Sequence, residues 1–393
     1  MIHHVDLRAG HGWLIKGKGH GVHPSLGRCR MKKNNRIAIL TGGGDCPGIN
    51  AVIRSVAKKA ILEYGMEIIG VADGYEGLIH DRHRRLHYDD VSGILTVGGT
   101  ILGTSNTSNP YQYAEKSGRR VRFKDVSRKA VRNSQKWGID ALVCIGGDGT
   151  LSIAHRLMLD GVPVVGVPKT IDNDLRGTEV TFGFDSAVAV ATDAVDRIHS
   201  TAQSHHRIMI IEVMGRRAGW IALYAGVAGG GDIILIPEVS YDLGAVAAKV
   251  KERKRKGRKF SIVVIAEGAR PRGGDIVIKR IVEKSTDPVR LGGIGFVLQD
   301  QLERATGMEA RTVVLGHLQR GGSPTAADRV LATQLGAETV DLIVRGELGR
   351  MAAVKDGSIT SVPLEVAAGG PRTVPLDNPL IAAARSIGTS FGD

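Results

Sequence analysis

Short apolar runs alternate with longer amphipathic segments over most of this chain, and turn residues separate them. The run RIAIL at 36–40 leads through TGGGDCPGIN into a segment with apolar residues at helical spacing, namely Val52, Val56, Ala60 and Ile61. The run EIIGVAD follows as a second strand pattern. This order of strand, helix and strand predicts a βαβ unit with parallel strands.

The same pattern recurs further along the chain. ALVCI at 141–145 has the composition of a buried strand, SIAHRLMLDG after it has helical spacing, and PVVGVP at 163–168 is the next strand. A second unit follows, with a helix over 185–200 and three strand patterns, RIMIIEV, IILIPE and SIVVIAEGA. The chain therefore predicts two α/β units.

At 393 residues the chain exceeds what one core usually supports, so two domains are expected. Their boundary is predicted in the loop that leaves Pro168 and runs through NDLRGTEVTFGF. The predicted strand RTVVLGHL at 311–318 and a long helix after Pro324 then complete one domain by a chain that crosses back.

The segment VCIGGDGT at 143–150 places three glycines, Asp148 and Thr150 at a predicted strand-to-helix corner. Glycine lets backbone N–H groups approach a ligand closely, and the start of the following helix attracts phosphate. Asp148 would repel phosphate unless a cation lay between them, so Mg²⁺ is expected here. The alternative is a tight glycine corner in which Asp148 caps Thr150 and the residues after it.

A second polar group, VPKTIDNDL at 167–175, comes directly after an apolar strand. It holds Lys169, Thr170, Asp172 and Asp174 within six positions, at the strand end where α/β proteins bind ligands. Two acids with a lysine beside them can supply a base and a charge clamp. The alternative is an Asx-rich turn that leaves a sheet.

A third group is cationic and surrounds one acid. Arginine binds phosphate with two parallel hydrogen bonds, and a histidine adds a further donor. Glu267, after the run SIVVIA, can accept a hydrogen bond from a sugar hydroxyl, although a structural hydrogen bond would also explain it. We expect all members of the group at or just beyond the C-terminal ends of apolar strands. The cations are Arg207, Arg216, Arg217, Arg311, His317 and Arg320; taken singly, each could be a surface charge.

The net charge of +13 raises the hypothesis of a nucleic-acid partner, so the location of the charge matters. Residues 1–30 hold five Lys and Arg against one Asp, and we expect them to be a flexible extension, or to reflect a start codon upstream of Met31. The basic run KERKRKGRK at 251–259 is expected to end a helix that begins near Leu243, where cations complement the helix dipole. Aromatic residues make up only 4% of the chain, so a stacking surface for nucleic acid is not expected.

Three cysteines, Cys29, Cys46 and Cys144, occur without a CxxC spacing, so a bound metal is expected to have oxygen ligands. No apolar stretch approaches the roughly 18 to 20 residues of a membrane span. The start of the chain also lacks the pattern of a signal peptide, so a cytoplasmic protein without a membrane partner is expected.

Seven segments together resemble the phosphofructokinase family over residues 36 to about 335: TGGGDCPGINAVIR, LGTSN, IGGDGT, PKTIDND, EVMGRRAGW, AEGAR and LGHLQRGGSPTAADR. The resemblance implies an α/β fold of two Rossmann-like, three-layer domains with mostly parallel sheets. It implies a donor domain over 31–183 plus about 319–372, and a sugar-phosphate domain over 184–318 plus the C-terminal segment. The implied reaction is transfer of the γ-phosphoryl group of Mg-ATP to the 1-hydroxyl of fructose 6-phosphate, which gives fructose 1,6-bisphosphate in glycolysis.

The resemblance also assigns roles to residues. It implies that Asp172 is the catalytic base, that Lys169, Thr170 and Arg216 act beside it, and that Asp148 binds Mg²⁺, directly or through water, with support from Asp174. The residues implied to line the nucleotide phosphates are Gly44, Gly147, Asp148, Gly149 and Thr150. Those implied to contact the sugar phosphate are Thr170, Ile171, Asp172, Arg207, Met214, Gly215, Arg216, Glu267, Arg311, His317, Leu318, Gln319 and Arg320. Arg207 and Arg311 resemble arginines that reach in from a neighbouring subunit, which implies a homodimer or homotetramer.

Gly149 is the position that discriminates between the two phosphoryl donors. Relatives that use pyrophosphate have a similar motif with an aspartate at this position. Two unit charges about 4 Å apart repel by roughly 4 kcal/mol at an effective dielectric constant of about 20, so an aspartate would disfavour the α-phosphate of ATP. Gly149 therefore favours ATP. The lysine at position 169 resembles the residue that pyrophosphate-dependent relatives carry there. The combination of Gly149 with Lys169 resembles the mixed-substrate group of the family. Asn106 stands where many ATP-dependent relatives carry arginine, so a nucleotide contact there is in doubt.

Three alternatives stay open. One is reversible, pyrophosphate-dependent phosphorylation of fructose 6-phosphate. Another is a different acceptor, because NAD kinases and lipid kinases also carry GGDGT, although without PKTIDND and LGHLQRGG. The most distant is a non-enzymatic nucleic-acid binder, which only the basic charge suggests.

Overall fold

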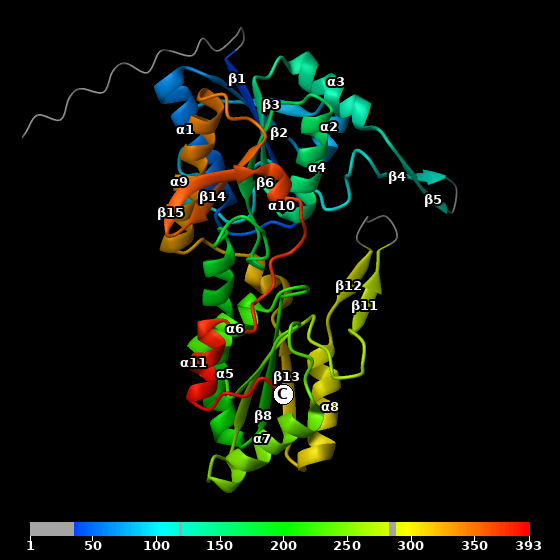
Figure 1. The fold of residues 1–393 in the computed structure, drawn as a ribbon, viewed down its shortest axis with the longest axis vertical. Helices are drawn as coiled ribbons and strands as arrows, with labels where there is room; N and C mark the ends of the chain where they lie inside the picture. Colours follow the sequence, from blue (N-terminus) through cyan, green and yellow to red (C-terminus); the bar gives the residue numbers. More distant parts are fainter. Residues whose placement is uncertain (1–34, 118–119, 283–287) are drawn as a thin grey trace, which may run out of the picture. The chain divides into compact units, whose positions relative to one another are not determined.

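The computed structural model of the protein describes residues 35–117, 120–282 and 288–393 (Figure 1). The extension predicted over residues 1–30 lies outside these ranges. Two parallel-type sheets and two antiparallel hairpins make up the strands of the described chain.

The larger sheet has seven strands in the order β15-β14-β7-β6-β1-β2-β3. Strands β14, β7, β6, β1 and β2 run parallel, and the two edge strands, β15 and β3, are antiparallel to their neighbours. Consequently the loops that follow β1, β6 and β7 emerge at the same edge of the sheet. The strands are β1 Arg36–Thr41, β2 Glu67–Val71, β3 His83–Leu86, β6 Ala141–Gly146, β7 Val164–Pro168, β14 Arg350–Lys355 and β15 Ser358–Pro363.

Helices cover both faces of this sheet. Helices α1 and α9 pack against each other on one face, whereas α2, α3, α4 and α10 lie on the other (Figure 1). Alternate strand residues, such as Ala38 and Leu40, point toward the second set of helices and form a buried core with Leu78, Leu151 and Leu157. The helices are α1 Ile49–Tyr64, α2 Tyr75–His80, α3 Ser127–Trp137, α4 Asp148–Leu159, α9 Ala326–Val344 and α10 Leu364–Ala367.

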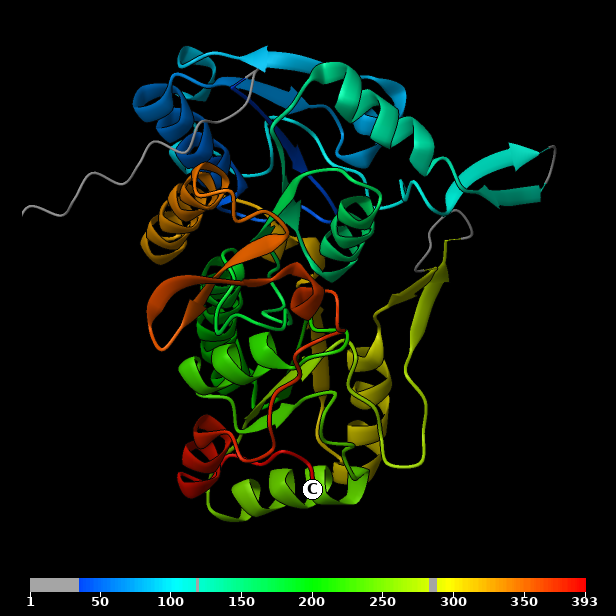
Figure 2. The same ribbon diagram turned by 45° about the horizontal axis from the view of Figure 1, so that its top comes forward.

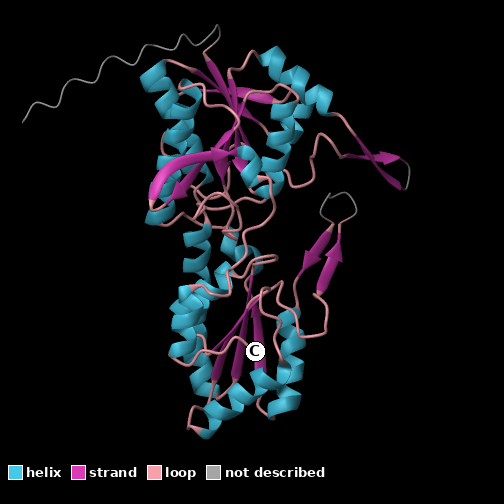
Figure 3. Ribbon diagram, in the orientation of Figure 1, coloured by secondary structure: helices cyan, strands magenta, loops and turns pink. Residues whose placement is uncertain are grey.

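The smaller sheet has four parallel strands in the order β13-β8-β10-β9. Helices α5 and α6 contact one face, and α7 and α8 share a core with the other (Figure 3). The strands are β8 Ile208–Val213, β9 Ile233–Leu235, β10 Ser261–Ala266 and β13 Ala310–Val314. The helices are α5 Phe184–His205, α6 Trp220–Ala228, α7 Leu243–Arg255, α8 Ile294–Thr306 and α11 Pro379–Ser386.

The C-terminal end of the chain joins this smaller sheet. Ser390 forms a parallel bridge with Ile233, its carbonyl oxygen accepts a hydrogen bond from the Ile234 amide, and Phe391 is fully buried. The two hairpins, visible in Figure 2, are β4 Tyr113–Ser117 with β5 Arg120–Lys124, and β11 Ile278–Ile281 with β12 Val289–Leu291.

The predicted α/β fold with mostly parallel sheets is confirmed. The helix expected over 185–200 is α5, which is longer. The basic run at 251–259 ends a helix as expected, since α7 begins at Leu243 and its last turn holds Arg253, Lys254 and Arg255. The strand predicted over 311–318 is wrong in its second half, because β13 ends at Val314, Gly316 has a positive φ of 49°, and Gly316–Arg320 form a 3₁₀ helix. No helix in the described ranges is long and apolar enough to cross a membrane. The domain limits stay a prediction.

Candidate active site

Lys169 joins the ends of three neighbouring strands. It follows β7, its amide donates to the carbonyl oxygen of Gly146 at the end of β6 (3.0 Å), and its Nζ donates to the carbonyl oxygen of Gly44 in the loop after β1. The side chain is only 4% exposed, and this burial lowers the pKa of Lys169 to about 8. The amine is therefore mostly charged at neutral pH and lies beside the backbone of a glycine loop.

The turn after Lys169 is held by its own polar groups. Thr170 Oγ1 accepts a hydrogen bond from the Asp172 amide and donates one to Asp174 Oδ1, both at 3.1 Å. Asn173 has a left-handed φ of 51°, and its Oδ1 accepts the Thr181 amide at 3.1 Å. The Asx-rich turn considered as an alternative is thus present, and it fixes Asp172 and Asp174 in a defined geometry.

Three carboxylates share this corner and repel one another. Burial raises the pKa of Asp172 to about 6, with Arg320 opposing the shift and Glu267 and Asp148 adding to it. Burial, followed by the charges of Asp172 and Asp148, raises the pKa of Asp174 to about 7. Asp172 Oδ1 is buried and has no hydrogen-bond partner within the described ranges. Buried polar atoms are normally satisfied by the protein, by ordered water or by a ligand, so this oxygen is free to accept a hydrogen bond from a bound hydroxyl or water.

These acids fit a divalent cation that is completed by a substrate. No group of three or more His, Cys, Asp or Glu side chains with metal-ligand geometry occurs in the described part of the chain. Mg²⁺ in proteins is commonly held by one or two carboxylates together with substrate phosphates and waters. Asp148 is partly exposed, and Asp172 and Asp174 are buried carboxylates close enough to repel it. This arrangement suits that mode of Mg²⁺ binding.

Two glycine loops flank this corner. The Thr150 side chain packs into them, since a Cβ placed on Gly42 or Gly146 would come within 2.6 Å of a Thr150 side-chain atom. By contrast, a Cβ on Gly149 would meet no atom of the described chain within 4 Å. The predicted space beside Gly149 therefore exists, at the first turn of α4, where the positive end of the helix dipole favours an anion.

Asp148 does not cap the helix in the expected alternative manner. Its Oδ1 accepts the amide of the adjacent Gly149 at 2.7 Å, and its Oδ2 lies 3.4 Å from Nη1 of Arg217. The side chain remains 41% exposed, so an oxygen can still reach a ligand.

Residues from the smaller sheet meet the same corner. Arg320 Nη1 donates to the carbonyl oxygen of Asp45 at 3.0 Å, and a Cβ on Gly44 would lie 2.7 Å from the same nitrogen. The Met214 amide donates to Oε1 of the fully buried Gln319 at 3.3 Å. The structure thus brings the EVMGRRAGW and LGHLQRGG segments together beside the first glycine loop.

Glu267 lies against the loop that contains Gly215 and Arg216. The amide of Gly268 donates to the carbonyl oxygen of Gly215 at 3.2 Å. Burial raises the pKa of Glu267, while the charges of Arg320 and Arg216 oppose the shift. Glu267 therefore sits close enough to these cations, and to Asp172, for their charges to act on one another.

Other predicted contacts are placed less favourably. The side chain of Ile171 is fully buried, so only its backbone can meet a ligand. His317 is exposed and Leu318 is 69% exposed, and both belong to the 3₁₀ helix that follows β13. Their roles stay predictions.

Arg207 and Arg311 do not lie where we expected them. Arg207 precedes β8 and Arg311 is near the start of β13, so both stand at the N-terminal end of the parallel sheet, opposite the ends that carry Arg216 and Glu267. Both pair with Glu309, Arg207 at 2.6 Å. The expectation that they follow strand ends is wrong, since each arginine comes before its apolar run in the sequence. A role in a neighbouring subunit stays a prediction.

Asn106 belongs to a loop that touches the first glycine loop. Thr104 Oγ1 donates to the Gly43 carbonyl oxygen at 2.6 Å, and the Gly43 amide donates to the Ser105 carbonyl oxygen at 3.2 Å. The Asn106 side chain is exposed at the edge of this contact. The segment is therefore adjacent to the first glycine loop, through the Thr104 side chain and the Ser105 backbone, and a nucleotide contact at Asn106 stays in doubt.

Sequence reasoning missed two residues that support the site. The Tyr75 hydroxyl donates to the Thr150 carbonyl oxygen at 2.7 Å, and DGYEGL at 73–78 directly follows the apolar run of β2, which was an available signal. Arg372 donates through Nη2 to the carbonyl oxygens of Asn173 (2.9 Å) and Glu179 (2.7 Å). No sequence pattern in the irregular segment around Arg372 predicts these hydrogen bonds.

Comparisons with known proteins give a consistent result. The family model described as Phosphofructokinase matches residues 36–343. An ATP-dependent 6-phosphofructokinase 2 of Clostridium perfringens is 51% identical, over 92% of this chain and 100% of its own length. An ATP-dependent 6-phosphofructokinase of Spirochaeta thermophila is 50% identical, over 91% of this chain and 97% of its own.

A solved structure is similar over most of the chain. The phosphofructokinase structure from Saccharomyces cerevisiae has a TM-score of 0.71 and 30% identity, and the match covers 92% of this chain. The chain spans about half of that longer yeast chain, with 48% of it covered.

Proposed function

The chain belongs to the phosphofructokinase family, and from this premise we propose that it transfers the γ-phosphoryl group of ATP to the 1-hydroxyl of fructose 6-phosphate, a step of glycolysis. The observation that carries the proposal is that Lys169 binds the first glycine loop at Gly44, while Asp172 lies close enough to Lys169 and to Asp148, in the second glycine loop, for their charges to interact. Phosphoryl transfer depends mainly on positioning and on neutralising charge, and this corner offers groups for both.

Asp172 is the proposed base. Its buried Oδ1 lacks a partner in the described chain, so a sugar hydroxyl can donate to it, and the proton of that hydroxyl passes to Oδ1 as the oxygen attacks phosphorus. Burial raises the pKa of Asp172 to about 6, which keeps it ionised at neutral pH but more basic than an ordinary aspartate.

Lys169 and the arginines are the proposed charge partners of the phosphoryl groups. Lys169 lies against the Gly44 backbone, and Arg320 contacts the next residue of the same loop. Thr170 supports the turn, and Arg216 lies near Glu267 on the sugar side. Met214, Gly215, Glu267, His317, Leu318, Gln319 and Arg320 remain the proposed sugar-phosphate contacts, with the backbone of Ile171.

Asp148, with Asp174 behind it, would hold Mg²⁺. When bound, the ion would neutralise charge on the donor phosphates. The elevated pKa values of Asp172 and Asp174 support this assignment, because a nearby cation would relieve the repulsion among the three acids.

ATP is proposed as the donor rather than pyrophosphate. The open space beside Gly149 can receive the nucleotide, and the relatives with about half of their residues identical are named as ATP-dependent enzymes. Lys169 can contact the transferred group with either donor, so it carries less weight.

Arg207 and Arg311 are proposed to serve the site of a neighbouring subunit in a homodimer or homotetramer. In their own chain they stand at the opposite end of the β8–β13 strand pair from Arg216, which supports this assignment.

The test is an aldolase-coupled assay of the purified full-length protein with fructose 6-phosphate and Mg²⁺, given ATP or pyrophosphate separately. The proposal expects fructose 1,6-bisphosphate from ATP alone. Product from pyrophosphate would overturn the donor assignment, and phosphorylation of NAD in place of the sugar would overturn the acceptor.

A further inference from the structure

The loop at 104–108 is bound to the glycine loop after β1 by the Thr104 side chain and the Ser105 backbone, and to helix α2 by the Ser108 side chain. Thr104 and Ser105 exchange hydrogen bonds with Gly43, as described above, so a displacement of this loop would displace the glycine loop after β1. Thr41 at the end of β1 adds a further bond, from its Oγ1 to the Gly103 carbonyl oxygen at 2.7 Å. A residue that holds this loop in place therefore influences the geometry of the donor site.

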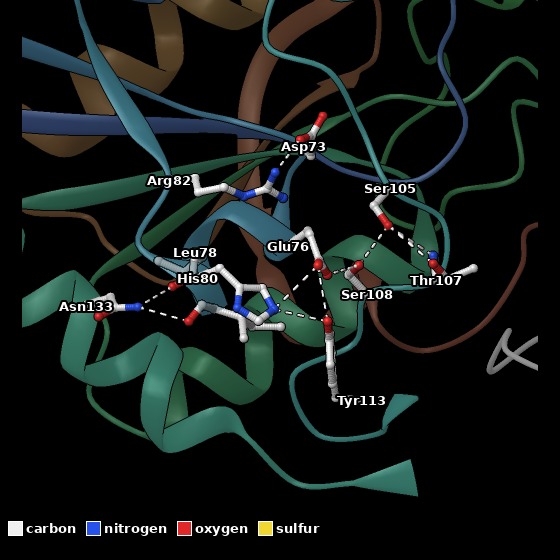
Figure 4. Close-up of polar contacts among 11 residues, drawn as sticks. Asp73, Glu76, Leu78, His80, Arg82, Ser105, Thr107, Ser108, Tyr113 and Asn133 are labelled. Atoms are coloured by element: carbon white, nitrogen blue, oxygen red, sulfur yellow. Dashed lines mark hydrogen bonds and ion pairs between the residues drawn. The ribbon is translucent and has the colours of Figure 1, made fainter. Parts of the chain in front are cut away.

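Glu76, in the first turn of α2, holds the loop through Ser108, on the side away from Gly43 (Figure 4). Ser108 Oγ donates to Glu76 Oε2 at 2.6 Å, a length typical of a hydroxyl bound to a carboxylate. Ser105 Oγ lies 2.8 Å from Ser108 Oγ. Because the Ser108 proton is directed to the carboxylate, Ser105 must be the donor to Ser108.

These hydrogen bonds all point in one direction and end at the carboxylate of Glu76. The Thr107 amide donates to Ser105 Oγ at 3.3 Å, Ser105 donates to Ser108, and Ser108 donates to Glu76. Each hydroxyl acts as both donor and acceptor, so the order depends on an acceptor at the end that cannot donate. An ionised Glu76 has that property.

Helix α2 is itself held firmly, which makes it a suitable anchor. Asn133 of α3 donates through Nδ2 to the carbonyl oxygens of Leu78 (2.8 Å) and Ile79 (3.2 Å) at its C-terminal end. At its N-terminal end, Tyr75 donates to Thr150 in the other glycine-loop segment. One short helix thus contacts both phosphate-binding segments, through Tyr75 and through Glu76.

A second arm of the network leaves Glu76 on the other side. The Tyr113 hydroxyl donates to Glu76 Oε1 at 3.1 Å, and His80 Nε2 lies 3.0 Å from the Tyr113 oxygen and 3.4 Å from Oε1. This arm leads to strand β4, and in the described part of the chain neither His80 nor Tyr113 forms a hydrogen bond with the 104–108 loop. It offers a control within the same network.

We propose that Glu76 is a positioning residue of the donor site, which holds the 104–108 loop against Gly43 through Ser108 and Ser105 and thereby sets the affinity for the nucleotide without touching it. The proposal rests on the proposed ATP-dependent function. It also gives this chain a way to order the loop that carries Asn106, where the resemblance implies that many ATP-dependent relatives have a charged contact.

The experiment measures ATP binding by calorimetry and steady-state kinetics for Glu76→Ala, Glu76→Gln, Ser108→Ala and Tyr113→Phe. Loss of one charge-assisted bond predicts about a tenfold rise in the Kd and KM for ATP with Glu76→Ala and Ser108→Ala, and a smaller rise with Glu76→Gln. The kcat and the KM for fructose 6-phosphate should stay within about twofold, as should all constants of Tyr113→Phe. Because both residues act in one chain, the double variant Glu76→Ala with Ser108→Ala should resemble either single variant.

Two results would overturn the proposal. One is an unchanged Kd for ATP in both Glu76→Ala and Ser108→Ala. The other is an equal loss in Ser108→Ala and Tyr113→Phe, which would indicate a general structural role. If Glu76→Ala does not fold, Ser108→Ala decides alone, with its thermal midpoint as the folding control. Failure of the wild-type protein to use ATP would instead refute the proposed function. The proposal for Glu76 is judged on the Kd for ATP of the variants, so the two failures can be told apart.

Discussion

Lys169 donates a hydrogen bond from Nζ to the carbonyl oxygen of Gly44, and so a buried amine from the end of β7 holds the glycine loop at the end of β1. These strands are two places apart in the sheet, with β6 between them. The bond places a positive charge where the donor phosphates are proposed to lie.

The pH dependence of kcat/KM should therefore be bell-shaped. Asp172 must be ionised to accept a proton, and its pKa of about 6 predicts that the rate rises with pH through that value. Lys169 must be protonated, and its pKa of about 8 predicts a fall through that value. Lys169→Met should lower the rate and remove the alkaline limb. The control is Lys59→Met, which removes a lysine of α1 that pairs with Asp341 of α9, and this variant should keep both limbs. A wild-type profile that stays flat well above pH 8 would contradict the role of Lys169.

Gly149→Asp should impair ATP use without harming the fold. A Cβ at this position meets nothing within 4 Å in the described chain, so the new side chain fits, and its charge would face the nucleotide. Two charges about 4 Å apart cost roughly 4 kcal/mol at an effective dielectric constant of about 20, which corresponds to a loss in kcat/KM for ATP of up to about a thousandfold. Gly149→Asn has nearly the same size without the charge and should lose far less. Equal losses in the two variants would mean that bulk, not charge, excludes the nucleotide.

Arg372 should support both the stability of the fold and the base-bearing turn. Its Nη2 holds the Asn173 and Glu179 carbonyl oxygens, its amide donates to the Asp174 carbonyl oxygen at 2.7 Å, and its guanidinium lies 4.6 Å from the Trp220 ring centroid. Arg372→Met should lower the free energy of unfolding by about 1 to 3 kcal/mol and kcat by about tenfold, since the turn loses two charge-assisted bonds.

A matched control for Arg372 exists in the C-terminal segment. Arg385 stacks similarly, 5.0 Å from the Phe391 ring centroid, but its guanidinium pairs with Asp393 and, among the described residues, forms no hydrogen bond with the turn. Arg385→Met should change thermal stability and leave kcat unaltered. If Arg372→Met shows the same pattern, Arg372 does not position the turn.

The strands and the site corner could largely be predicted from the sequence, because buried parallel strands are continuous apolar runs. Every residue of β6, β8 and β10 is buried, and each was expected as a strand. The late strands β14 and β15 were not identified as members of the first sheet. Strand β14 joins the sheet by pairing with β7, which lies far away in the sequence, and β15 joins it by pairing with β14.

The remaining errors have local causes. The apolar residues Val313 to Leu315 suggested that β13 continues, but the positive φ of Gly316 ends it. Arg207 and Arg311 were grouped with Arg216 by residue type, although Arg207 precedes β8 and Arg311 is the second residue of β13. Glu76 and Arg372 act through hydrogen bonds to segments that lie far away in the sequence, which no periodic pattern reveals.

Asp172→Asn should stabilise the protein at neutral pH. The folded-state pKa of Asp172, about 6, lies above the ordinary aspartate value, so ionisation opposes folding. This cost is absent at low pH, grows as pH rises between the ordinary value and about 6, and is complete above about 6. The gain in thermal midpoint from Asp172→Asn should therefore be larger at pH 8 than at pH 4.5. The same gain at both pH values would show that Asp172 is not strained by its burial.

The central claim is that Asp172 accepts the proton of a sugar hydroxyl while the donor is held in the glycine loops. The most direct measurement is the transfer of label from γ-³²P-labelled ATP to fructose 6-phosphate by the wild-type protein and by Asp172→Asn, with ATP binding measured for both. A role of Asp172 as the base predicts equal ATP binding, labelled fructose 1,6-bisphosphate from the wild type, and transfer at least about a hundredfold slower in the variant. Transfer at the wild-type rate by Asp172→Asn would contradict it.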